Sequence, residues 1–119
     1  MRIISFAWTA PALLAGHKTC TRRAWTEAYA QRFKQGDLVA AYDRNPRFGG
    51  KKVATIRLTR APYLENTADM PPADYRNEGL QYMEEEGLTI QGQHPYDFWI
   101  FWGAKRENVW VVRFEVVKA

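Results

Sequence analysis

The sequence predicts an α+β fold, in which a small curved β-barrel of about five strands has three or so helices packed around it. The 119 residues suffice for one hydrophobic core, and 46% hydrophobic with 25% charged residues is typical of a packed domain. Segments with strand and helix periodicity follow one another without the regular strand–helix alternation of a parallel sheet. We therefore expect residues 1–119 to form a single domain.

The first half of the chain is expected to hold four strands and two helices. The strands cover residues 2–8, 19–23, 38–42 and 53–58. Thr9 is expected to cap a short helix that has Pro11 in its first turn and ends at Gly16. The second helix follows from the helical spacing of apolar residues between Trp25 and Phe33, and Gly36 ends it.

The second half is expected to hold two helices and the last strand. The first helix covers roughly residues 73–86, with Gly79 as its weak point. The pair His94-Pro95 is expected to start the next helix, although residues 96–102 also fit a buried strand. Residues 109–117 have the pattern of a final strand.

Charge is divided unevenly along this chain, whose net charge is +4. Residues 1–60 carry 12 Lys/Arg and 3 Asp/Glu, a net charge of +9, whereas residues 61–119 carry 5 and 10, a net charge of −5. A basic surface suits partners that bear phosphates, and five Trp offer side chains that can stack on bases. The pattern favours a nucleic-acid or nucleotide partner, with a merely solvated surface as the alternative.

Cysteine and histidine content limits the chemistry. Cys20 is the single cysteine, so neither an internal disulfide nor a Cys-rich zinc site can form, and His17 and His94 are far apart in sequence. We expect no metal and no cofactor, and a reducing cytoplasmic location fits best. No apolar stretch approaches the about 20 residues of a membrane span, so no membrane partner is expected. The oligomeric state is left open.

Residues 16–23, Gly-His-Lys-Thr-Cys-Thr-Arg-Arg, form a G-x-K-x-x-T-x-R pattern. Gly16 permits a turn with positive φ, in which backbone N–H groups can approach a ligand. On the strand that follows, Thr21 and Arg23 share one face. Lys18 joins them only if it lies in the turn that enters the strand. The pattern therefore predicts a turn–strand junction with Lys18, Thr21 and Arg23 facing one cavity.

Two chemistries suit that arrangement. In the first, Lys18 and Arg23 hold a phosphate or a base carbonyl, and Thr21 donates a hydrogen bond. In the second, Lys18 is a neutral amine that acts as general base on the hydroxyl of Thr21. A basic strand start without any ligand is the third interpretation.

The same motif resembles the signature of the ASCH family, small relatives of the RNA-binding PUA domains. The pattern Phe33-x-x-Gly36-Asp37 and the later pair Glu78-Gly79 are similar in order and spacing, and nearly the whole chain fits. The resemblance implies a PUA-like barrel. ASCH domains are thought to act on RNA, and some small members are amidohydrolases that remove acyl groups from N4-acylated cytidines.

The resemblance implies that Lys18, Thr21 and Glu78 are the catalytic residues. Lys18 would activate Thr21, which attacks the exocyclic amide carbonyl, and Glu78 would orient Lys18 or deliver a proton to the leaving nitrogen. Backbone N–H groups near Gly16 are candidates for stabilising the oxyanion. Arg23 is the candidate for anchoring a base carbonyl or a phosphate.

Further candidate contacts lie on both sides of the motif. Trp8 and Trp25 could stack on a base, although a core position is the commoner fate of each. The candidate contacts to a nucleic-acid backbone are Arg22, Arg44, Arg47, Lys51 and Lys52. Arg22 is expected to point away from Arg23 into solvent. Residues 44–52 form a basic hairpin tip, which either grips an RNA backbone or is a plain solvated loop.

Together with this resemblance, the sequence predicts a protein that binds RNA or a modified nucleoside, and hydrolysis of N4-acylcytidine is one activity that the resemblance implies. The alternatives are a non-catalytic RNA-binding module and a metal-free ribonuclease in which Lys18 and Arg23 hold the scissile phosphate. The lack of an evident His pair for acid–base catalysis disfavours the ribonuclease. The acyl group, and the choice between free nucleoside and polymer, are left open.

Overall fold

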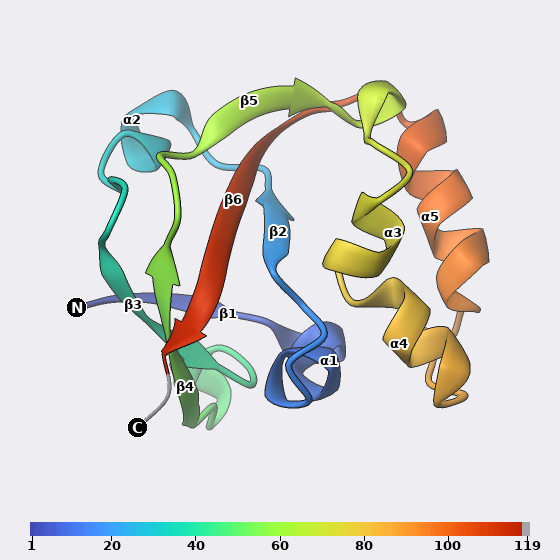
Figure 1. The fold of residues 1–119 in the computed structure, drawn as a ribbon, viewed down its shortest axis with the longest axis horizontal. Helices are drawn as coiled ribbons and strands as arrows, with labels where there is room; N and C mark the ends of the chain where they lie inside the picture. The colour runs from blue at the N-terminus through green and yellow to red at the C-terminus, as the bar shows by residue number, and fades with distance from the viewer. Residues whose placement is uncertain (118–119) are drawn as a thin grey trace.

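The structure is a computed structural model that describes residues 1–117, and it shows a mixed sheet curled into a half-barrel with helices around it (Figure 1). The strands are β1 (Arg2–Ser5), β2 (Cys20–Arg23), β3 (Leu38–Tyr42), β4 (Lys52–Leu58), β5 (Tyr63–Asn66) and β6 (Asn108–Val117). The α-helices are α1 (Ala10–Leu14), α2 (Glu27–Ala30), α3 (Asp74–Asn77), α4 (Leu80–Glu85) and α5 (Pro95–Ala104). Three 3-10 turns complete the described elements, η1 (Ala7–Thr9), η2 (Pro46–Phe48) and η3 (Thr67–Asp69). The predicted α+β class with a small curved sheet is confirmed.

Strand β6 connects the two parts of the sheet. Its second half pairs antiparallel with β4, beyond which lie β3 and then β1. Its first half lies between β2 and β5, antiparallel to both. Only β1 and β3 pair in parallel within the described chain. Because β6 changes partners along its length, the twisted sheet closes partly around one face.

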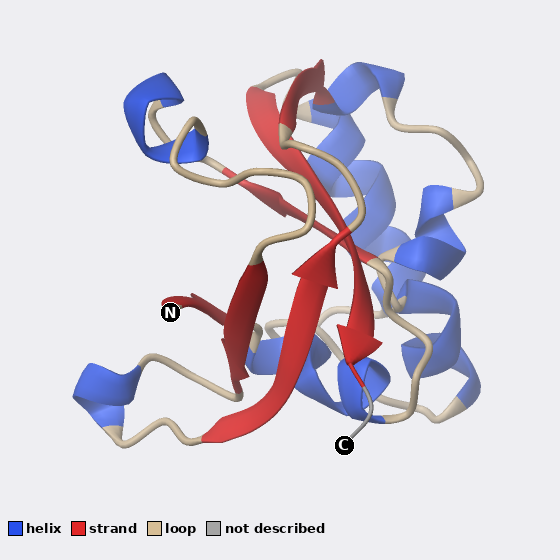
Figure 2. Cartoon of the chain, turned by 60° about the vertical axis from the view of Figure 1, so that its left-hand side comes forward, coloured by secondary structure: helices blue, strands red, loops and turns tan. Residues whose placement is uncertain are grey.

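Two apolar clusters lie on either side of α1. The larger one fills the inside of the curled sheet and contains Ile4, Phe6, Leu13, Phe33, Val39, Ile56, Leu58 and Phe114. The smaller one joins α1 to α4 and contains Ala12, Leu80, Met83 and Ile90. Successive residues Ala12 and Leu13 therefore belong to different clusters, so that α1 fixes the helical layer against the sheet. Figure 2 shows α3, α4 and α5 gathered on one side of the strands.

The helices of the second half follow the expected outline with one break. The helix expected over residues 73–86 is divided into α3 and α4 at Glu78, because Gly79 has a φ of 90°. Residues 96–102 are helical and not a strand. The helix starts at Pro95, where Nδ1 of His94 accepts a hydrogen bond from the Tyr96 N–H at 3.1 Å.

Three local expectations for the first half are corrected. The first strand ends at Ser5, since Ala7 has a φ of 46° and turns the chain into η1. Thr9 does not cap α1 with its side chain; its hydroxyl donates to the carbonyl of Phe6 at 3.0 Å. The second helix is reduced to Glu27–Ala30. Among residues 1–117, no helix has both the length and the apolar character to cross a membrane.

Gly79 is predicted to be costly to replace, since it combines positive φ with tight packing. A Cβ at this position would lie 2.6 Å from Cβ of Ala12 and 3.3 Å from Cβ of Lys18. We expect Gly79→Ala to lower the free energy of unfolding by about 3 kcal/mol, from left-handed strain and overpacking together. The matched control is Gly16→Ala, where φ is 80° but no atom lies within 4 Å. Urea unfolding should show that Gly16→Ala lowers the free energy of unfolding by only ~1 kcal/mol. Equal losses in the two variants would contradict the packing argument.

Candidate functional site

A cavity of about 270 Å³ lies where the segment after β1, strand β2 and helix α5 meet. Its polar lining residues are Ser5, Thr9, Lys18, Thr21, Arg22, Arg23, Glu78 and Gln91, and its apolar ones are Phe6, Ala7, Trp8, Leu80, Ile90, Phe98 and Trp102. The volume is just below the range of pockets for drug-sized ligands and suits a single ring system. A larger hollow, about 670 Å³, is lined mainly by apolar residues and brings no group of reactive side chains together.

Lys18 is buried at the cavity, with 2% of the residue exposed. Its Nζ donates to Oε1 of Glu78 at 2.9 Å and to the backbone carbonyl of Glu78 at 2.8 Å. That carbonyl lies at the break between α3 and α4, where helical hydrogen bonding is interrupted. An ammonium has three donor hydrogens, so one hydrogen of Lys18 remains for a ligand.

Glu78 uses its second carboxylate oxygen for Arg22. Nη1 of Arg22 donates to Oε2 at 2.8 Å, and only 3% of Glu78 is exposed. Because a guanidinium does not give up its protons in proteins, Oε2 acts only as an acceptor. A proton that leaves Lys18 can therefore be received by Glu78 on Oε1 alone.

Arg22 has a side chain with 0% exposure that bridges three carboxylates. Besides Glu78, its Nε donates to Glu65 at 2.8 Å and its Nη2 donates to Asp74. Asp74 also accepts two hydrogen bonds from Arg113, at 2.7 and 3.1 Å. Burial alone would lower the pKa of Arg22, but the hydrogen bond to Glu65, the charge of Glu78 and the hydrogen bonds to Asp74 and Glu78 raise it. In the described chain every buried side-chain nitrogen and oxygen has a partner, which is what makes buried charges tolerable.

Thr21 and Arg23 lie on the other face of β2. Nε of Arg23 donates to Oγ1 of Thr21 at 3.1 Å, so the hydroxyl hydrogen stays free for another acceptor. Burial lowers the pKa of Arg23 and the negative charge of Glu78 opposes this, but a guanidinium remains charged. The Nη atoms of Arg23 make no hydrogen bond within residues 1–117. Since no fully buried nitrogen there lacks a partner, these atoms retain some exposure, and Arg23 lines the cavity, so they are candidates for binding a ligand.

Aromatic side chains form the walls of the cavity. Trp8 of η1 is 52% exposed at the rim, while Phe98 and Trp102 of α5 lie with their ring centroids 5.6 Å apart. The ring of Phe6 lies 5.4 Å from Cζ of Arg23, within cation–π distance. Flat apolar walls with a few polar groups suit a planar ring whose edge forms hydrogen bonds.

The predicted site residues fall into two groups in space. Lys18, Thr21, Arg23, Glu78 and Trp8 all line the cavity, although Nζ of Lys18 and Oγ1 of Thr21 are not hydrogen-bonded to each other in the described residues. The cations of the second group lie around η2, outside the cavity, and all are exposed: Arg44, Arg47, Lys51 and Lys52.

Three candidate contacts are corrected by the structure. The N–H of Gly16 donates to the carbonyl of Leu13 at 3.0 Å, so it is not available to an oxyanion, and Gly16 does not line the cavity. Trp25 also lies outside the cavity and stacks on Phe33 with ring centroids 4.6 Å apart. Arg22 is buried and not exposed, because three carboxylates surround it, so it cannot contact a nucleic-acid backbone.

Sequence reasoning missed the carboxylates that hold Arg22, although two signals were present. Asp74 and Glu78 are four residues apart, which places them on one side of a helical segment. Arg22 also alternates with Cys20, and an unpaired cysteine is usually buried, so the face they share was the buried one. Nothing local to the chain indicated Glu65, which comes from β5.

The carboxylates around Arg22 neutralise that guanidinium and do not form a cation site. Over the part of the chain that the structure describes, no group of three or more His, Cys, Asp or Glu could hold a metal ion. What the arrangement offers is a buried, hydrogen-bonded ion pair, Lys18 with Glu78, beside the hydroxyl of Thr21 and the guanidinium of Arg23.

Comparison with known proteins bears on the fold. No protein-family model matches the chain, and no curated protein matches it. Among solved structures, the chain is similar to the crystal structure of protein EF3133 from Enterococcus faecalis V583, described under the family model DUF984. The TM-score is 0.58 at 16% sequence identity, and the match covers 98% of this chain and 76% of that one. At this identity the likeness shows the fold alone.

Asp74 is predicted to stabilise the fold in a pH-dependent manner. Burial alone would raise the pKa of Asp74, but hydrogen bonds from Arg113, Arg22 and Asn77 lower it to about 2 from an ordinary value of 3.8. The folded-state pKa is lowered, so the stabilisation is present above about pH 4 and is lost as pH falls through about 2. At neutral pH the wild-type protein should have a higher free energy of unfolding than Asp74→Asn. This difference should shrink by ~1–2 kcal/mol between pH 5 and pH 2.

Urea unfolding across that pH range measures this margin. The control is Asp69→Asn, since Asp69 is exposed and makes no ion pair with another described residue. We expect the control to follow the wild type within ~0.5 kcal/mol at each pH. A margin for Asp74→Asn that stays constant down to pH 2 would show that its ionisation is not linked to folding.

Proposed function

We propose that the cavity binds an N4-acylated cytidine and hydrolyses its exocyclic amide, as do the ASCH amidohydrolases that the motif resembles. Lys18, Thr21 and Glu78 are the catalytic residues of this proposal. It is supported above all by one observation: the buried Lys18–Glu78 pair, a threonine hydroxyl and the free Nη atoms of Arg23 line the same cavity. The aromatic walls and the volume of about 270 Å³ are suited to a single base.

The reaction begins with a proton moving within the buried pair. Lys18 passes a proton to Oε1 of Glu78 along their 2.9 Å hydrogen bond and becomes a neutral amine. The amine then removes the hydroxyl proton of Thr21. Negative charge that develops on Oγ1 is stabilised by the donor Nε of Arg23, at 3.1 Å.

Acyl transfer follows from this arrangement. Oγ1 of Thr21 attacks the acyl carbon, the bond from that carbon to N4 breaks, and N4 takes the proton held by Lys18, so that cytidine leaves. Water then attacks the acyl ester and gives a proton to Lys18, and Thr21 regains a proton from Lys18 as the ester bond breaks. The acid product ionises to a carboxylate and releases a proton to solvent, and Glu78 returns its proton to Lys18.

Arg23 takes the stabilising role expected of the backbone near Gly16. The N–H of Gly16 is engaged inside the turn, whereas the Nη atoms of Arg23 are free and reach the cavity. Two parallel donors suit the carbonyl oxygen of the base or the oxygen that becomes negative during attack. Arg23 also adjoins Thr21, so one side chain serves both oxygens.

The ribonuclease alternative receives no support from histidine. His17 stacks on Tyr82 at 4.9 Å and His94 caps α5, and neither lines the cavity. A non-catalytic RNA-binding module would use the cavity without proton transfer, and the buried Lys18–Glu78 pair would then have no chemical role. The hydrolase proposal gives this pair a role, so it accounts for more of the cavity's residues than the binding module does.

Turnover of N4-acetylcytidine to cytidine, followed by liquid chromatography, tests the proposal. Thr21→Ala should lower kcat by about 10³-fold or more, because no nucleophile remains, while circular dichroism stays that of the wild type. Thr21→Ser should retain part of the activity, since it keeps the hydroxyl. If folded wild-type protein releases no cytidine, the proposed hydrolase activity is wrong.

The role of the buried pair is tested separately with substitutions that conserve shape. Lys18→Arg keeps a positive charge but cannot act as a neutral base, so we expect a loss of activity similar to that of Thr21→Ala. Glu78→Gln should lower kcat by about 10²-fold or more, since the amide cannot take a proton from Lys18. The exposed Glu86 provides the matched control, Glu86→Gln, which should keep full activity. Full activity of Lys18→Arg would exclude Lys18 as the base.

A further inference from the structure

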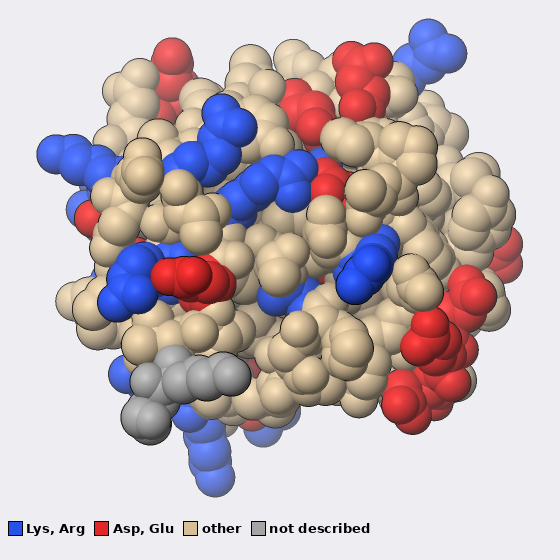
Figure 3. Space-filling view, in the orientation of Figure 1, with Lys and Arg blue, Asp and Glu red and all other residues tan. Residues whose placement is uncertain are grey.

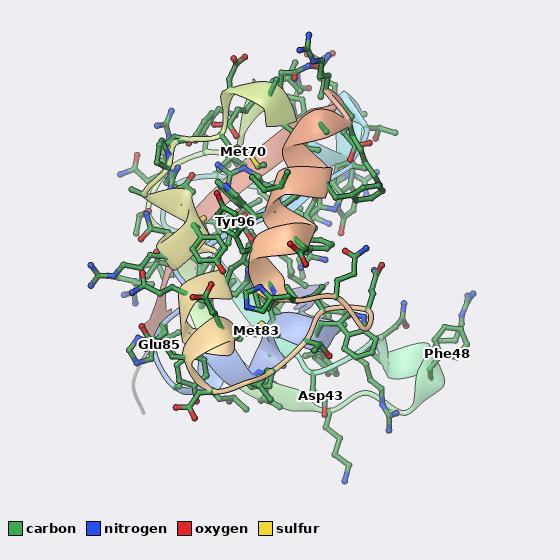
Figure 4. The ribbon with its side chains drawn as sticks, turned by 90° about the vertical axis from the view of Figure 1, so that its right-hand side faces the viewer. Asp43, Phe48, Met70, Met83, Glu85 and Tyr96 are labelled. Carbon is green, nitrogen blue, oxygen red and sulfur yellow. The ribbon has the colours of Figure 1, made fainter. Side chains whose placement is uncertain are left out.

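A strongly basic loop connects β3 to β4. Residues 43–52 form this basic tip. They contain Arg44, Arg47, Lys51 and Lys52 but a single acid, Asp43, so their net charge is +3. All four cations are exposed, and none forms an ion pair with a carboxylate of residues 1–117. Phe48 is 72% exposed at the outer end of this loop, which projects from the body of the molecule (Figure 4).

The parallel pairing of β1 with β3 places the basic tip next to the cavity. Ser5 lies opposite Tyr42 at the ends of these strands, and the N–H of Phe6 donates to the carbonyl of Tyr42 at 2.9 Å. Beyond that contact, β1 continues into the cavity wall at Phe6 and Trp8, and β3 continues into the basic tip at Asp43. The two segments therefore leave the sheet side by side. In Figure 4 the connection between α4 and α5, which carries Gln91, extends in the same direction as the tip.

The basic tip is held in shape by its own hydrogen bonds. Oδ1 of Asp43 accepts from the N–H of Lys51 at 2.8 Å, and Oδ1 of Asn45 accepts from the N–H of Arg47 at 2.8 Å. Gly50 packs so closely that a Cβ would lie 1.8 Å from the carbonyl oxygen of Arg44. The cations are thus presented on a formed loop, which lowers the entropy lost when a ligand binds.

Charge over the rest of the molecule favours the approach of an anion from the tip side. On the face that Figure 3 shows, acidic side chains gather at the lower right, over α4, with further ones at the top, whereas the Lys and Arg side chains lie mainly on the left, over the sheet. The acidic group includes the exposed residues Glu84, Glu85 and Glu86. A polyanion is therefore repelled by the acidic side chains over α4 and attracted to the cations over the sheet.

We propose that the basic tip binds the phosphate backbone of a single-stranded nucleic acid while one base of the same strand enters the cavity. This rests on the proposed function only for the base in the cavity; binding at the tip requires no hydrolysis. A free nucleoside has no phosphate and would leave all four cations without a partner. Phe48 and Trp8, 72% and 52% exposed, present flat faces to unstacked bases, which a single strand offers and a duplex hides.

Fluorescence anisotropy with a labelled 12-nucleotide single-stranded RNA, measured over a series of salt concentrations, tests the tip. The variant Arg44→Ser/Arg47→Ser/Lys51→Ser should bind more weakly, and its slope of log K against log[salt] should be less steep by about 2, from ~0.7 per lost phosphate contact. The matched control is Arg32→Ser/Lys34→Ser/Arg60→Ser, which removes the same charge at the opposite ends of β3 and β4. The control should keep the wild-type slope. Equal effects in both variants would overturn the proposal, because net charge alone would then explain binding.

Single-strand preference is tested with Phe48→Ala. Loss of a stacking face should weaken binding to the single strand about tenfold and leave binding to a duplex of equal length unchanged. Equal affinity of the wild type for single strand and duplex would overturn the single-strand assignment.

Hydrolysis of free N4-acetylcytidine separates this inference from the proposed function. The triple tip variant should hydrolyse the free nucleoside at the wild-type rate, since none of its three positions lines the cavity. If the wild-type protein hydrolyses the nucleoside but binds no single strand at low salt, nucleic-acid binding by the basic tip is refuted and the hydrolase proposal stands. If single-strand binding depends on the basic tip but no nucleoside is hydrolysed, the hydrolase proposal is refuted and binding at the basic tip stands.

Discussion

The architecture of the cavity depends on one buried guanidinium that satisfies three carboxylates from separate parts of the chain. Arg22 of β2 joins Glu65 of β5, Asp74 of α3 and Glu78 at the helix break. Without it, Asp74 would keep only Arg113 and Glu78 only Lys18 as ion-pair partners, and Glu65 would have none among the described residues. Leaving a buried charge without its partner costs several kcal/mol. The same contacts leave one oxygen of Glu78 facing Lys18, so the group that neutralises the buried charge also orients the Lys18–Glu78 pair.

Two backbone features bring these charges to the same place. Alternation along β2 sends Thr21 and Arg23 to one side and Arg22 to the other, so that a four-residue strand contributes both to the buried charge network and to the free polar groups of the cavity. The left-handed conformation of Gly79 ends α3 just after Glu78 and exposes the Glu78 carbonyl to Lys18. Both features are short, and both are strictly local in sequence.

Locality also explains what could be predicted from the sequence. Strand 38–42, the weak point at Gly79 and the common face of Thr21 and Arg23 follow from spacing and backbone preference, and they were predicted. The burial of Arg22 was not, because its partners lie 43 to 56 residues away and a single sequence does not show which acids will surround a strand. The N–H of Gly16 was misjudged for a different reason, since its acceptor is local: the carbonyl of Leu13, three residues earlier at the helix end, engages it.

The partner changes of β6 have a consequence for biosynthesis. Strands β2 and β5 join the rest of the described sheet only through β6, which the ribosome makes after every other strand described. Until it emerges, the nascent chain can pair only β1, β3 and β4, and β2 has no neighbour to hold its guanidinium among the acids. The cavity and the ion pairs of Arg22 should therefore form late in synthesis. The many contacts between residues far apart in sequence favour slow folding, during which chaperones can bind the chain.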